Sequence, residues 1–115
     1  MDKYSVYLSE PAEQDIDEIS LYIATQLSAP MTAENMVETF FQAMSSLEIM
    51  PKRHPLVVDV FLASLGYRML PIKSYLIFFT VDDSLPGVRE VNIERVLYAG
   101  RDWQNIINNN MRMLE

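Results

Sequence analysis

The side chains best suited to chemistry in this sequence are four cations of its second half and the tryptophan beside the last one. They are Arg68, Lys73, Arg95, Arg101 and Trp103. A guanidinium binds carboxylates or phosphates through paired hydrogen bonds, and a neighbouring aromatic ring can supply an apolar anchor. In an antiparallel meander these positions can come together on one sheet face, so the set predicts a shared functional site. In the alternative interpretation, the cations only solvate an exposed sheet face, Arg101 forms a weak surface pair, and Trp103 closes the core.

Several other kinds of site are excluded by residue type and spacing. The three glycines, Gly66, Gly87 and Gly100, lie too far apart for a loop that cradles phosphates. One histidine, His54, and no cysteine leave no cluster for zinc or for a nucleophilic triad. The carboxylates of the first helix are typical of a solvated face. We therefore expect no metal site and no cofactor.

Charge is distributed unevenly along the chain. The net charge is −7, but residues 1–50 hold nine acids and one base (−8), whereas residues 51–115 hold seven acids and eight bases (+1). An acidic protein is a poor ligand for a polyanion, so only a local basic site in the second half remains. The absence of cysteine fits a reducing compartment, and the first residues, MDKYSVYLSE, lack the pattern of a signal peptide. No run is long enough to span a membrane, so we expect a cytoplasmic protein.

The first half of the chain predicts a strand and two helices. Residues 3–8 alternate polar and apolar, as in a strand, and Ser9 can cap a helix whose apolar stripe extends to Leu27. The acids Asp15, Asp17 and Glu18 of this helix are expected mostly in water. Thr32 can cap a second helix, and the short loop between the two predicts a helical hairpin.

Three β-rich runs follow Gly66, and they predict an antiparallel meander. The middle run, from Tyr75 to Val81, is almost continuously apolar and should be central and buried on both faces. Pro71 lacks an N–H group, so the first run should end or bulge there. Residues 59–65 carry no clear pattern, and the tail is expected to fray or to form a short helix. The predicted fold is α+β, with a short N-terminal strand, a helical hairpin and an antiparallel meander packed on the helices, in a single domain of residues 1–115.

Two motifs resemble the RelE/ParE superfamily of small toxins from bacterial type II toxin–antitoxin modules. They are GYRMLPIKSYLIFFTVDD and VNIERVLYAGRDW, preceded by the strand and helix VYLSEPAEQDIDEISLYI. The resemblance implies one of two activities. RelE-like members cleave mRNA in the ribosome with strand lysines and arginines and a terminal tyrosine, whereas ParE-like members poison DNA gyrase. It also implies a cognate antitoxin whose partly disordered segment wraps the toxin.

The residues that match the nuclease pattern are few. Arg68 and Arg101 match two basic positions, but Leu70, Leu76 and Ile107 stand where the nucleases carry polar groups. Leucine and isoleucine cannot transfer a proton. The resemblance is therefore nearer the ParE-like branch. It implies a toxin that inhibits growth by binding a host target such as gyrase, without nuclease activity. The alternatives are a ribosome-dependent mRNA endonuclease using Arg68 and Arg101, or a degenerate member that only binds its antitoxin.

Overall fold

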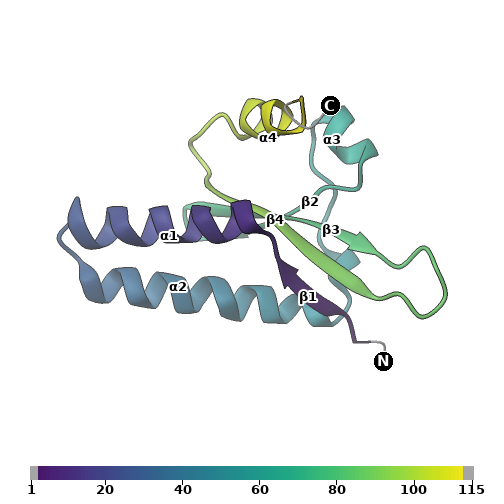
Figure 1. The fold of residues 1–115 in the computed structure, drawn as a ribbon, viewed down its shortest axis with the longest axis horizontal. Coiled ribbons are helices and arrows are strands. Elements are labelled where there is room, and N and C mark those ends of the chain that lie inside the picture. The colour runs from purple at the N-terminus through teal and green to yellow at the C-terminus, as the bar shows by residue number, and fades with distance from the viewer. Residues whose placement is uncertain (1–2, 113–115) are drawn as a thin grey trace.

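The structure, a computed structural model, describes residues 3–112. In chain order its elements are β1 (Ser5–Leu8), α1 (Glu10–Thr25), α2 (Pro30–Ser45), the 3-10 turns η1 (Ser46–Glu48) and η2 (Pro51–Arg53), α3 (Val60–Ser64), β2 (Arg68–Ile72), β3 (Tyr75–Asp82), β4 (Glu90–Tyr98) and α4 (Trp103–Arg112). Figure 1 shows α1 and α2 as an antiparallel hairpin, with α3 and α4 on the far side of the sheet from it. The predicted α+β fold with a helical hairpin is confirmed.

The N-termini of the two long helices are capped differently. Ser9 caps α1 as predicted, because its hydroxyl oxygen accepts a hydrogen bond from the Ala12 N–H at 3.2 Å. The prediction that Thr32 caps α2 is wrong, since α2 begins two residues earlier, at Pro30, and no side chain caps it. Proline is tolerated there because the first N–H groups of a helix have no partner within the helix.

The sheet has the strand order β1-β4-β3-β2. The last three strands form the predicted antiparallel meander, and β1 joins it by pairing in parallel with β4. In β3, residues 76–79 are all buried, as predicted for a central strand. Because neighbouring side chains of a strand point to opposite faces, Ile77 and Phe79 pack under the hairpin while Leu76 and Phe78 face the other side.

A second apolar core, absent from the sequence prediction, covers this other side. It contains Val57, Leu62, Tyr67, Leu76, Phe78, Leu97 and Ile107, with Trp103 packed against it. The segment without a clear pattern supplies α3, whose N-terminus is capped by Asp59 through a 2.9 Å bond from the Leu62 N–H. The meander therefore lies between two helical layers, and not on one hairpin alone.

The expected end or bulge at Pro71 is wrong. β2 passes through it in regular register, with Pro71 opposite Leu76. The Met69 N–H points away from β3 and donates to the Pro55 carbonyl at 3.3 Å. The backbone direction of a strand repeats every two residues, so the nitrogen of Pro71 also points away from β3. β2 is an edge strand, so the missing N–H of Pro71 removes no bond to β3. The bulge lies in β4, where Arg95 pairs with Phe78 and Ile93 with Phe79, which leaves Glu94 between them.

Candidate functional site

A groove of about 620 Å³ lies where the sheet ends beside the C-terminal half of α1. We call it the strand-end groove; its lining includes Glu18, Tyr22, Leu27, Tyr75, Tyr98 and Arg101. Leu27 belongs to the predicted apolar stripe of α1, yet 57% of its surface is exposed. Tyr22 and Tyr98 are about half exposed as well. The groove thus offers apolar and aromatic surface to a partner, next to one cation.

The side chains of the groove are held by aromatic packing and by a tight turn. The Tyr75 ring packs edge-on against Phe40 at 5.4 Å and against Tyr98 at 6.0 Å between ring centroids. Burial, followed by the influence of Tyr22 and Tyr98, raises the pKa of Tyr75. A Cβ atom at Gly100 would lie 2.4 Å from the Tyr98 ring, so only glycine fits under this ring without a shift. The Arg101 N–H closes the turn on the Tyr98 carbonyl at 3.0 Å.

Arg101 and Lys73 lie at the same end of the sheet. Lys73 occupies the turn between β2 and β3 with φ of 54°, and both side chains are exposed. The Ala99 N–H donates to the Ser74 carbonyl at 2.8 Å, which joins this turn to the end of β4. Of the five residues predicted to bind a partner, these two cations are the ones whose exposure suits that role. The role itself stays a prediction.

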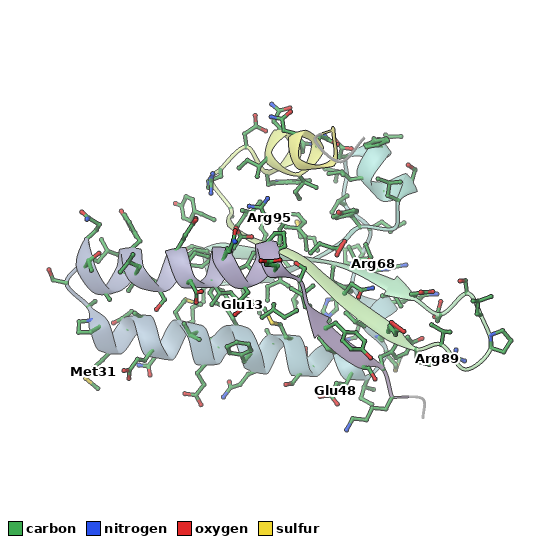
Figure 2. The ribbon with its side chains drawn as sticks, viewed as in Figure 1. Glu13, Met31, Glu48, Arg68, Arg89 and Arg95 are labelled. Atoms are coloured by element: carbon green, nitrogen blue, oxygen red, sulfur yellow. The ribbon has the colours of Figure 1, made fainter. Side chains whose placement is uncertain are left out.

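Arg95 instead forms an ion pair within the protein. Its guanidinium makes two bonds to the Asp15 carboxylate, at 2.7 and 2.8 Å, and the Val96 N–H donates to the same carboxylate at 2.9 Å. The Arg95 side chain is 15% exposed and that of Asp15 7%. The bond to Asp15, offset in part by burial, raises the pKa of Arg95. The prediction that Asp15 lies in water is therefore wrong, and Arg95 forms a structural ion pair beside the first turns of α1 (Figure 2).

Arg68 and Trp103 also have partners within the fold. Arg68 donates to the carbonyls of His54 at 2.7 Å and of Lys52 at 3.3 Å, and so fixes the loop before α3. The Trp103 ring packs on Phe78 with 5.0 Å between centroids and is partly buried. The interpretation that Trp103 closes a core is confirmed. The predicted common site of all five residues is not gathered at one place.

The positions that a nuclease would need lie mostly inside the protein. Leu76 and Ile107 are buried at 9% and 2% exposure, in the second core. Among the ionisable groups, burial raises the pKa of Glu94 despite its hydrogen bond with Tyr67. Burial, with Glu94 beside it, raises the pKa of Tyr67 to about 12. Burial, with Arg53 nearby, lowers the pKa of His54. None of these three lines the strand-end groove.

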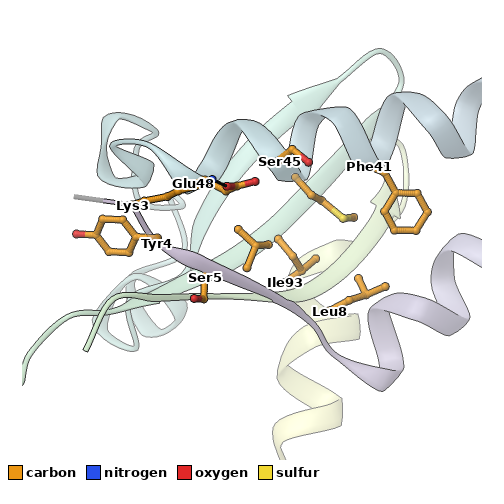
Figure 3. A pocket seen from close by; sticks show the side chains of 10 residues that line it. Lys3, Tyr4, Ser5, Leu8, Phe41, Ser45, Glu48 and Ile93 are labelled. Atoms are coloured by element: carbon orange, nitrogen blue, oxygen red, sulfur yellow. Dashed lines mark ion pairs between the residues drawn. The ribbon is translucent and has the colours of Figure 1, made fainter. Parts of the chain in front are cut away.

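A second pocket of about 470 Å³ lies between β1 and the end of α2 (Figure 3). Val6, Met44 and Ile93 line it, and Lys3 and Glu48 form an ion pair of 3.1 Å at its rim. The Tyr4 N–H donates to the Glu48 carbonyl at 2.7 Å, so the chain itself occupies one end of the β1 edge. Within residues 3–112 no three acidic or histidine side chains are grouped to hold a metal ion. No helix in the same range is long and apolar enough to cross a membrane.

Comparison with known proteins agrees with this architecture. Residues 6–103 match a family model described as the ParE toxin of the type II toxin–antitoxin system parDE. The chain is similar to a solved structure of the chromosomal ParDE toxin–antitoxin system from P. aeruginosa, with a TM-score of 0.68, 18% identity, and coverage of 85% of this chain and 98% of that one. It is also similar to the RelBE2 toxin–antitoxin complex from Mycobacterium tuberculosis, with a TM-score of 0.54, 23% identity, and coverage of 84% and 98%. No curated protein sequence matches significantly.

Proposed function

This chain belongs to the ParE toxin family of type II toxin–antitoxin systems, and from this premise we propose that it inhibits growth by binding a host target, DNA gyrase, through the strand-end groove. A cognate antitoxin neutralises it by covering the same surface. The two similar solved structures are of toxin–antitoxin systems, which supports an antitoxin partner here.

The observation that carries this proposal is the composition of the strand-end groove. It combines three tyrosines, an exposed leucine and one arginine with two carboxylates, Glu18 and Asp15, of which Asp15 is paired with Arg95. Tyrosine and arginine are enriched at the points of protein interfaces that contribute most binding energy. Arg101 can make a charge-assisted bond to a carboxylate of the partner while the rings supply apolar contact. These are features of a docking surface for a protein.

The same groove is a poor match to the acid–base pair that RNA cleavage requires. Transfer of the 2′-hydroxyl proton needs a side chain that can take it up near neutral pH, and a second that can protonate the leaving group. The lining offers Glu18, Asp15, which is paired with Arg95, an arginine and tyrosine hydroxyls. Burial raises the pKa of Tyr75 further from neutrality. Arg68, the other residue that matches the nuclease pattern, donates to loop carbonyls instead. This supports binding over catalysis.

The antitoxin is expected to extend from the strand-end groove along the hairpin. A segment that folds as it binds usually covers more than a standard interface, roughly above 1,600 Å². An acidic residue of this segment would face Arg101. Co-expression with the product of the adjacent gene, followed by gel filtration, tests for a stable complex; two proteins that elute separately would contradict it.

The target is tested by inducing the chain alone in bacteria and by adding the purified protein to two reactions. Gyrase with supercoiled DNA should accumulate cleaved DNA, and translating ribosomes should leave mRNA intact. Arg101→Ala should weaken the gyrase effect, while Lys3→Ala, which removes an exposed cation at the far end of β1, should not. Cleavage of mRNA at codon boundaries that Arg101→Ala abolishes would overturn the proposal in favour of an endonuclease. Antitoxin binding without any effect on growth would indicate a degenerate member.

A further inference from the structure

Five large apolar residues are exposed on α3, in the segment before it and at the residue that follows it. We call them the α3 patch: Leu56, Val58, Val60, Phe61 and Leu65. Val58 and Val60 are 84% and 85% exposed, which is unusual for β-branched apolar side chains. Contiguous exposed apolar surface of this kind marks interaction sites.

The α3 patch is held in place by its buried neighbours. Val57 lies between two exposed residues and is buried, and its N–H donates to the Tyr67 carbonyl at 3.0 Å. Leu62 is fully buried, and Asp59 caps the helix through the Leu62 N–H. Val57 and Leu62 point into the second core, whereas the five residues of the α3 patch near them are exposed. The α3 patch is therefore a preformed surface.

The charge of the protein lies on the opposite face of the sheet. Residues 10–45, the hairpin, hold seven acids and no lysine or arginine, a charge of −7 that equals the net charge of the chain. Residues 56–67 hold one acid, Asp59, and residues 103–111 of α4 hold no charged side chain. The hairpin packs on the side of Ile77, and α3 and α4 pack on the side of Leu76. Figure 1 shows the sheet between these two layers.

We propose that the α3 patch is the interface through which two copies of this chain form a symmetric dimer. Two copies that each carry −7 repel one another wherever their hairpins approach. A two-fold contact through the α3 patch places both hairpins on the outside. With layers about 10 Å apart, the hairpins then lie on the order of 40 Å from each other, several Debye lengths at physiological salt.

The composition of the α3 patch also fits a second copy better than a different protein. A two-fold interface uses the same surface on both partners, so an uncharged apolar surface is complementary to itself. Interfaces between identical chains are more apolar than those of transient complexes. The dimer leaves the strand-end groove open, since the groove lies beside α1 on the hairpin side of the sheet. It does not depend on the identity of the target or antitoxin.

Sedimentation equilibrium of the purified chain tests this, over a wide range of protein concentration and at low and high sodium chloride. The wild-type protein should approach twice the monomer mass, and salt above the physiological concentration should change association little, because the hairpins of the dimer already lie several Debye lengths apart. Val60→Glu should raise the dimer dissociation constant at least about tenfold. Val60→Lys should do the same although it lowers the negative charge, because either charge is desolvated in the interface. Circular dichroism confirms that these surface variants remain folded.

Met31→Glu is the matched control, since Met31 is 76% exposed on the hairpin and gains the same charge far from the α3 patch (Figure 2). It should leave the dissociation constant nearly unchanged. A wild-type chain that stays monomeric at every concentration and salt would overturn the proposal. So would a dimer that tolerates both Val60 variants but is broken by Met31→Glu. Protection of the α3 patch from hydrogen exchange only when an antitoxin is bound would assign the surface to that partner instead.

Discussion

Replacing Asp15 by alanine should destabilise this protein more than any other exchange of a single carboxylate on α1. The Asp15 carboxylate accepts all three of the bonds that join α1 to β4 at this point, two from Arg95 and one from the Val96 N–H. Without it, a guanidinium that is only 15% exposed has no counter-charge, and a buried N–H has no acceptor.

Removing one partner of a buried ion pair costs about 3–5 kcal/mol, because the other charge stays buried and unpaired. The free energy of unfolding of such a domain is about 5–15 kcal/mol, so the variant should lose roughly a fifth or more of it. Asp15→Asn should cost less, since the amide keeps one acceptor oxygen. Arg95→Met combined with Asp15→Ala should cost less than the sum of the two single changes, because no unpaired charge remains.

Urea denaturation followed by circular dichroism measures these differences. Asp17→Ala is the matched control: Asp17 lies two residues along the same helix and is exposed, so its loss should change the unfolding free energy by under about 0.5 kcal/mol. If Asp15→Ala and Asp17→Ala had equal small effects, the pair would not hold α1 on β4 and the structural role assigned to Arg95 would be wrong.

Three further outcomes follow from individual side chains. Arg101→Ala should lower growth inhibition by about thirtyfold or more, the equivalent of about 2 kcal/mol of binding, and change the unfolding free energy by about 0–1 kcal/mol; full toxicity would show that this cation is only a solvated strand end. Trp103→Ala should cost about 2–3 kcal/mol in thermal melts, less than the 3–5 kcal/mol of a fully buried ring, because Trp103 is partly exposed. The pKa of Tyr67 rises from 10 to about 12 on folding, so the folded state holds this proton more tightly; the resulting stability is complete below pH 10 and is lost as pH rises through 12, by at most about 2.7 kcal/mol. Tyr67→Phe should remove this part of the alkaline decline in urea titrations, and identical declines in both proteins would contradict it.

Much of the fold could be predicted because it depends on local pattern. The almost continuous apolar run of β3 predicts a strand buried on both faces, and Ser9 marks the start of α1. A local sequence pattern cannot predict the environment of a side chain whose binding partner lies far away in the chain. Asp15 resembles a surface residue because its partner, Arg95, lies 80 residues away. The bulge that leaves Glu94 unpaired in β4 carries no such signal.

The candidate site likewise combines one residue that the sequence indicates with others that only the fold brings together. Arg101 could be singled out because a cation directly after a strand is visible in the sequence, and it does line a groove. The three tyrosines could not, since an amphipathic pattern indicates which face of α1 is apolar but not where the sheet beneath it ends. Leu27 continues the stripe past that end and is therefore exposed. Arg68 was predicted to bind a partner, yet it donates to the loop that precedes α3, a contact that only the folded chain shows.

The parallel pairing of β1 with β4 gives this chain a particular order of events during its synthesis. Leu8 pairs with Ile93, so 85 residues must be translated before the first strand meets its neighbour. At about 5–20 residues per second, the ribosome needs roughly 4–17 s for this stretch. The hairpin ends at Ser45, 48 residues before Ile93, so for roughly 2–10 s of this time the hairpin is complete while the strands that will cover its apolar stripe are still being synthesised. The strand-end groove, which includes Tyr98 and Arg101, is thus incomplete until the last strand has emerged, whereas the hairpin is made seconds earlier.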